Sequence, residues 1–84
     1  MNTSPITTTQ RAILLLLARG YLLRHNRQVD TWRDSFLSER HSAANCQWLA
    51  DQGFITLKQS VRTDKLTRVD IFAINDNGRR IAVE

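Results

Sequence analysis

Cysteine, proline and glycine are scarce in this chain. Cys46 is the only cysteine among 84 residues, so no disulfide within the chain can cross-link the fold. A lone cysteine in so short a chain argues against a secreted, disulfide-rich scaffold and favours a reducing cytoplasm. The chain has one proline and three scattered glycines, which excludes a glycine-rich phosphate loop. We therefore expect one cytoplasmic domain that depends on a small hydrophobic core.

Long hydrophobic runs and catalytic clusters are also missing. Residues 12–23 are apolar, but Arg19 and Gly20 interrupt them, and the run is shorter than the roughly 20 residues that a membrane-spanning helix needs. His25 and His41 are far apart and have no cysteine partner, whereas a zinc site needs about four convergent ligands. The sequence thus predicts no membrane segment, no metal, no cofactor and no enzyme activity.

What the chain does have is an excess of positive charge. Twelve lysines and arginines face eight aspartates and glutamates, which gives a net charge of +4, and ten of the twelve cations are arginine. Arginine presents a planar fork of donors that fits phosphate groups and guanine edges. Nucleic acid is therefore the first partner to consider for a basic domain of this size. An excess this small is also compatible with a role in solubility alone.

The first predicted helix is unusually apolar. TTTQ supplies N-cap residues for a helix that begins near Thr8 or Thr9 and carries RAILLLLARGYLLRH. Gly20 ends this helix, or the helix continues to about His25. Apolar residues lie on nearly all its sides, which predicts a buried position and more apolar surface than one small core can cover. We therefore expect a homodimer. The residues expected at its interface are Leu15, Leu16, Tyr21 and Leu22.

A short second helix is predicted over residues 31–40. Asp30 can cap it, and Trp32 and Phe36 recur at the spacing of one helical turn, which would place both rings on the core side, with Leu37 as a further candidate for that side. The residues SERHS then form a turn toward the next element.

The third predicted helix covers residues 42–52, with Ser38 or Ser42 as its cap and Gly53 as its terminal glycine. On a helical wheel Cys46, Leu49 and Ala50 share one face, which we assign to the core. A buried Cys46 is expected to be chemically inert.

After Gly53 the hydrophobic period changes to two. Residues 54–61 and 67–74 are predicted to form two strands of a β-hairpin with a polar tip at 63–65. Asn75 is then expected to cap a short final helix.

This order of elements resembles the winged helix-turn-helix superfamily of DNA-binding proteins, and most of all its bacterial MarR and PadR types. The matching stretches are TQRAILLLLARG, SAANCQWLADQGFI and FAINDNGRRIA, and the resemblance covers roughly residues 8–82. It implies an α+β fold with three helices, a two-stranded β-hairpin wing and a short C-terminal helix. Residues 1–7 would form a flexible arm, and residues 8–84 a single domain.

The resemblance also implies which residues face DNA. The recognition helix of a helix-turn-helix lies in the major groove with its N-terminal residues leading, and the wing contacts the backbone. Glutamine can pair with adenine, and alanine can touch a thymine methyl group. The expected recognition residues are Arg40, His41, Ser42, Ala43, Ala44 and Gln47, and the expected wing residues are Lys58, Arg62, Lys65 and Arg68. Solvated polar surfaces, and cations that protect an edge strand, are the alternative explanations.

Trp48 does not fit a DNA-facing surface, because it lies opposite the core face beside Asp51. Three positions stay open: beneath the wing or last helix, in a subunit or partner interface, or against DNA. Two functions follow. The first is a small transcriptional regulator, such as a dimeric repressor from a phage or other mobile element, that binds double-stranded DNA. The second is a winged-helix interaction module that inhibits a host nucleic-acid machine through the Trp48 face, without recognising DNA.

Overall fold

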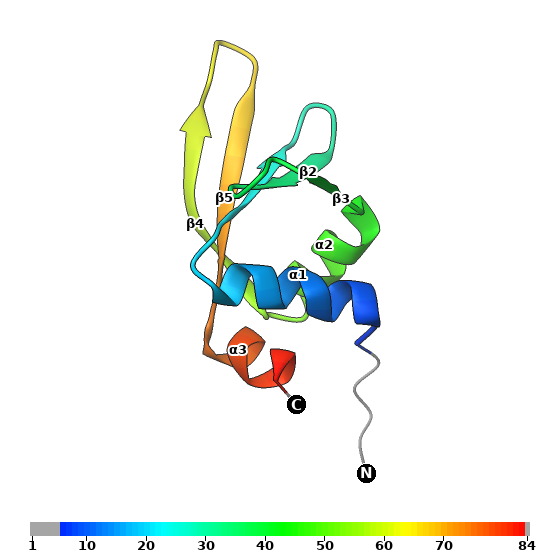
Figure 1. Cartoon of the computed structure of the whole chain (residues 1–84). Helices are drawn as coiled ribbons and strands as arrows, with labels where there is room; N and C mark the ends of the chain where they lie inside the picture. Colours follow the sequence, from blue (N-terminus) through cyan, green and yellow to red (C-terminus); the bar gives the residue numbers. More distant parts are fainter. Residues whose placement is uncertain (1–5, 84) are drawn as a thin grey trace.

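In the computed structural model, which describes residues 6–83, three helices pack on one face of a five-stranded antiparallel sheet (Figure 1). The strand order is β3-β2-β1-β5-β4, so β1 is the central strand. The fold is therefore α+β, as predicted. The elements are α1 (Thr8–Ala18), β1 (Leu23–Asn26), β2 (Thr31–Asp34), β3 (Arg40–His41), α2 (Ala43–Asp51), β4 (Ile55–Arg62), β5 (Arg68–Ile74) and α3 (Asp76–Ala82).

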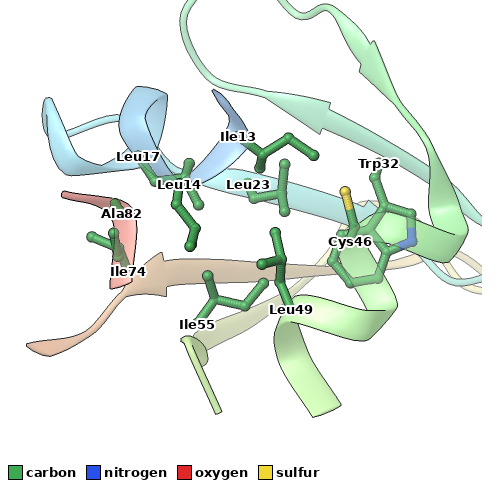
Figure 2. Close-up of a cluster of buried hydrophobic side chains, with 10 residues drawn as sticks. All are labelled: Ile13, Leu14, Leu17, Leu23, Trp32, Cys46, Leu49, Ile55, Ile74 and Ala82. Atoms are coloured by element: carbon green, nitrogen blue, oxygen red, sulfur yellow. The ribbon is translucent and has the colours of Figure 1, made fainter. Parts of the chain in front are cut away.

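The core lies between the helices and one face of the sheet. Ile13 and Leu14 of α1 lie with Leu23 of β1 near the middle, and the cluster extends from Ala82 at one end to Trp32 at the other (Figure 2). Strand alternation sends every second side chain of β1, β2 and β5 into this layer. The buried apolar residues are Ile13, Leu14, Leu17, Leu23, Trp32, Cys46, Leu49, Ile55, Ile74 and Ala82.

Helix α1 begins as its sequence predicts but is less buried than predicted. Thr7 and Gln10 form a reciprocal capping box, in which each side chain accepts a hydrogen bond from the other residue's backbone N–H. The helix ends at Ala18, and Gly20 follows in the left-handed region with φ +105°. The alternative of a helix to His25 is therefore wrong. One side of α1 packs on the core, while Leu15 on another side is 43% exposed.

The helix predicted over residues 31–40 does not form. Thr31–Asp34 is strand β2, with Trp32 and Asp34 buried in alternation, and β3 follows a short loop. The carboxylate of Asp34 accepts hydrogen bonds from the backbone N–H groups of Phe36 and Leu37, which holds a turn where the helix was expected. The spacing of Trp32 and Phe36 imitated a helical period, although these residues belong to a strand and to an exposed loop.

The second half of the chain follows the prediction closely. Helix α2 is capped by Ser42, and Gly53 follows it with φ +80°. The β4–β5 hairpin comes next and projects beyond the helices (Figure 1). Asn75 caps α3 by accepting a hydrogen bond from the N–H of Gly78 at 2.9 Å. Arg11 of α1 donates to the carbonyl groups of Ile81 and Ala82, which joins the first helix to the end of the last.

Two details of the predicted architecture need correction. Five strands are paired instead of two, because β1 and β2 extend the hairpin sheet and β3 adds an edge. Within residues 6–83, α2 follows a strand, so no helix-turn-helix precedes the hairpin.

The segment expected to form an N-terminal arm includes two residues that belong to the fold: Ile6 packs on the core, and Thr7 caps α1. Residues 1–5 and 84 lie outside the described residues.

Candidate nucleic-acid interface

The β4–β5 hairpin carries the clearest group of exposed cations. These are Lys58, Arg62, Lys65 and Arg68, which are all exposed and which form no ion pair within residues 6–83. A register shift between Leu57 and Gln59 puts Lys58 in a bulge of β4. Cations on a projecting hairpin can reach phosphate groups without desolvating the core.

The two acids of this hairpin are already occupied. Asp64 accepts hydrogen bonds from the N–H groups of Leu66 and Thr67, both at 2.8 Å, and these bonds lower the pKa of its carboxyl group. Asp70 is buried and pairs with Arg27 through two hydrogen bonds of 2.6 and 3.1 Å. The bond from Arg27 holds the pKa of Asp70 below its ordinary value, against the opposite effect of burial. Neither carboxylate neutralises a cation of the hairpin group.

The beginning of α2 presents part of the predicted recognition surface. Arg40, Ser42, Ala44 and Gln47 are exposed, and Ser42 also accepts a hydrogen bond from the N–H of Asn45 at 3.3 Å. Gln47 donates from Nε2 to Asp51 at 2.9 Å. To bind a base edge, the amide of Gln47 would have to release Asp51. It can do so because Gln47 and Asp51 are both exposed.

His41 and Ala43 lie differently from this group. Successive strand residues point to opposite faces, so His41 turns away from the side that Arg40 occupies. Its Nε2 lies 2.8 Å from Oδ2 of Asp34, and only 18% of its side chain is exposed. Ala43 packs against the core. His41 and Ala43, which the sequence predicted to face DNA, therefore lie away from the exposed side of α2.

The buried carboxylate of Asp34 accepts hydrogen bonds from three groups around it. Burial alone would raise the pKa of Asp34, but hydrogen bonds from His41 and from the backbone of Leu37 and Phe36 outweigh it, and the pKa lies below its ordinary value. His41, the last residue of β3 before the cap of α2, is thereby bonded to the end of β2. Asp34 thus helps to set where the exposed face of α2 begins.

Trp48 packs inside the molecule. Its ring centroid lies 5.9 Å from that of Phe54, at an angle of 57°, and the indole is half-buried against the core cluster. Of the three positions left open by the sequence, this arrangement corresponds to internal packing, beneath the start of β4. Trp48 therefore offers little free surface for a partner.

The residues predicted at a dimer interface differ in exposure. Leu15 is exposed, whereas Leu16, Tyr21 and Leu22 are half-buried. The ring of Tyr21 packs against Phe36 of the β2–β3 loop in a tilted arrangement, with ring centroids 4.6 Å apart and an angle of 36° between the planes. Sequence reasoning missed Phe36 as a surface residue, because it was assigned to the core side of a helix.

Other chemistry is limited in the described part of the chain. Burial raises the pKa of the Cys46 thiol to about 12. Between residues 6 and 83, no three His, Cys, Asp or Glu side chains are grouped so that they could hold a metal ion. None of the helices described is both long and apolar enough to cross a membrane.

Comparisons with protein-family models, with curated proteins and with solved structures found no match to this chain.

Proposed function

We propose that this protein is a small DNA-binding transcriptional regulator that contacts double-stranded DNA with the α2–hairpin unit. Its fold would then be a variant of the winged helix, in which strands β2 and β3 replace the helix before the recognition helix. The observation that carries this proposal is the cation group on the β4–β5 hairpin, directly after a helix whose first turns expose small and polar side chains. Residues Arg40, Ala44 and Gln47 would face the major groove.

The hairpin would supply affinity that does not depend on the base sequence of the DNA. Lysines and arginines that neutralise phosphates release condensed counterions, so the logarithm of affinity falls by about 0.9 per phosphate for each decade of salt. Four such contacts predict a slope of about −3.6 and roughly a hundredfold loss of affinity between about 50 and 200 mM salt.

The exposed face of α2 would supply sequence preference. Gln47 is the residue best placed for a base edge, because its side chain is longer than that of Ala44 and lies on the same exposed side. Loss of its amide should change preference at one base pair, by about 1–3 kcal/mol. Gln52 provides a matched control, since it is an exposed glutamine at the C-cap of the same helix.

The test is a fluorescence anisotropy titration of the full chain with duplexes drawn from a genomic library, at a low and a higher salt concentration. We expect binding at low salt, a steep salt dependence, and a changed base preference for Gln47→Ala but not for Gln52→Ala. Absence of binding at low salt would overturn the proposal.

We also propose that the protein binds DNA as a dimer through the outer side of α1. Leu15 is 43% exposed in a helix whose residues 12–18 are all apolar, which is the kind of surface that a second subunit covers. Light scattering should report a dimer for the wild type and a monomer for Leu15→Arg, with Ala12→Arg on the same helix as a second probe. A monomeric wild type at micromolar concentration would contradict this part.

A second candidate function has one observation in its favour. The β2–β3 loop exposes Phe36 and Leu37 at 50% and 66%, and such residues suit a protein partner better than DNA. A winged-helix interaction module that inhibits a nucleic-acid machine would use this loop, since Trp48 is packed internally. This function predicts weak duplex binding that is indifferent to Gln47→Ala, so the same titration separates the two candidates.

A further inference from the structure

Three arginines stand in one row across three adjacent strands. Arg24 of β1 is paired in register with Arg33 of β2, and Arg33 is paired with Arg40 of β3. Residues directly opposite each other in an antiparallel sheet point to the same face, and neighbouring strands are only about 4.8 Å apart. Like charges directly opposite destabilise a sheet. The row therefore contains two unfavourable pairs in succession, without an acid between them.

The arginine row, which we define as Arg24, Arg33 and Arg40, lies on the face of the sheet that the helices leave open. Leu23 and Trp32, the neighbours of Arg24 and Arg33 in the chain, are buried on the helix side, while all three arginines are exposed. Protection of a sheet edge accounts for a cation on β3, which is an edge strand. It does not account for Arg24, because β1 is the central strand.

Two of the guanidinium groups are anchored on one residue. Arg24 donates from Nη2 to the hydroxyl of Ser38 at 2.9 Å, and Arg33 donates from Nη1 to the carbonyl of Ser38 at 2.7 Å. Each guanidinium carries five N–H donors, so most of them are left for another acceptor. Over residues 6–83 the row forms no ion pair with a carboxylate. The carboxylate of Asp34, the buried acid that follows Arg33, is bound to His41 on the other face.

A hollow lies beside these two groups. Its volume is about 190 Å³, and it is lined by Arg24, Asn26, Thr31, Arg33 and Val69. This volume is below the roughly 300 Å³ at which sites for larger organic ligands begin. It suits a small charged group that enters from the solvent. An amide and a hydroxyl on its wall add neutral hydrogen-bonding partners to the two cations.

We infer that the arginine row binds neighbouring phosphate groups at this hollow on the open face of the sheet. Guanidinium forks match phosphate oxygens in bidentate geometry, and two forks held side by side with a third one strand away match more than one negative charge. Such phosphates occur in a nucleic-acid backbone and in free diphosphates. Arg40 also belongs to the surface that we propose for α2, whereas Arg24 and Arg33 do not, so this site extends that surface onto the open face of the sheet.

The first arm of the test uses inorganic pyrophosphate and the full chain. Nitrogen-15 NMR should show saturable shifts of the Arg24 and Arg33 Nε–Hε signals as pyrophosphate is added at constant ionic strength, and no shift of Arg19. Arg33→Gln should weaken pyrophosphate binding about tenfold or more, as expected for loss of a hydrogen bond to a charged group. Arg19→Gln removes the same charge at the end of α1 and should leave the affinity for pyrophosphate unchanged. Arg24→Lys keeps the charge but loses the planar guanidinium, so its affinity for pyrophosphate should lie between those of the two glutamine variants.

The second arm identifies the source of the phosphates and uses duplex DNA. If Arg33→Gln weakens duplex binding more than Arg19→Gln does, the backbone of nucleic acid occupies the site. If only pyrophosphate binding falls, a free diphosphate occupies it. Absence of saturable shifts, or equal effects of the Arg33 and Arg19 variants on pyrophosphate binding, would overturn the inference. Pyrophosphate binding can be measured even if the protein binds no duplex. A failure of the proposed DNA-binding function is therefore distinguishable from a failure of the phosphate site.

Discussion

Substitution of Gly78 by alanine should destabilise this protein, although alanine is the better helix former. Gly78 is buried in α3 where the helix passes the chain before β4. A Cβ atom at this position would overlap the carbonyl oxygen of Phe54 and would lie 2.7 Å from Cγ1 of Ile74. A carbonyl of the backbone cannot rotate away as a flexible side chain can. Either α3 or the start of β4 would therefore have to move.

The magnitude follows from three contributions. Overpacking of this kind costs about 1–3 kcal/mol, and displacement of Phe54 endangers the bond that its carbonyl accepts from the N–H of Asn75, at a cost of about 1 kcal/mol. Helix propensity returns about 1 kcal/mol. We expect a net loss of about 2 kcal/mol, which corresponds to a melting temperature lower by roughly 8–16 °C in a domain of this size.

Urea and thermal denaturation followed by circular dichroism would measure this loss. Tryptophan fluorescence would report the same region in part, because Trp48, one of the two indoles, packs against Phe54. Asn77→Ala is the matched control, since Asn77 is an exposed neighbour in α3 and should change stability by less than about 0.5 kcal/mol. A Gly78→Ala variant as stable as the wild type, or more stable, would refute the close contact between α3 and the start of β4.

Three further outcomes are expected. Asp34→Ala should cost about 2–3 kcal/mol in urea denaturation, because it removes the acceptor of two backbone N–H groups and of His41. The pKa values of Asp34 and Asp70 lie below their ordinary value of 3.8 in the folded state, so the stability they contribute should be complete above about pH 5 and should fall as the pH drops below 4. In Asp34→Ala the free energy of unfolding should fall less steeply at acid pH. An unchanged fall would contradict the contribution assigned to Asp34. The Cys46 thiol should resist a disulfide reagent at mildly alkaline pH and react after unfolding, since burial raises its pKa to about 12.

The second half of the fold was predictable because its signals are local. Ser42, Gly53 and Asn75 delimit α2 and α3 through caps and a left-handed glycine, and each needs only residues a few positions away. The hairpin strands follow from a period of two over several residues. These elements form as expected, within one or two residues of their predicted bounds.

The region between α1 and α2 was not predictable in this way. Trp32 and Phe36 are four residues apart, which favours a helix when no other information is used. The turn depends instead on the Asp34 carboxylate, whose buried position is set by contacts with the rest of the fold. Pairing of β1 with β5 is likewise a contact between distant parts of the chain. Local preference is overridden in such a case by tertiary contacts.

The candidate surfaces also divide into one that local sequence predicts and one that depends on tertiary contacts. Exposure of the hairpin cations follows from the hairpin itself, so Lys58, Arg62, Lys65 and Arg68 could be selected from the sequence. The row formed by Arg24, Arg33 and Arg40 could not, because it exists only in the register of β1, β2 and β3.

The measurement that tests the proposed function most directly compares Lys65→Ala with Arg19→Ala in duplex binding across a series of salt concentrations. Both variants lose one positive charge from an exposed site, but only Lys65 lies at the tip of the β4–β5 hairpin. We predict that Lys65→Ala weakens binding to all sequences and reduces the salt slope by about one unit, while Arg19→Ala keeps the wild-type slope. Equal slopes for the two variants would contradict the assignment of the hairpin to the DNA backbone.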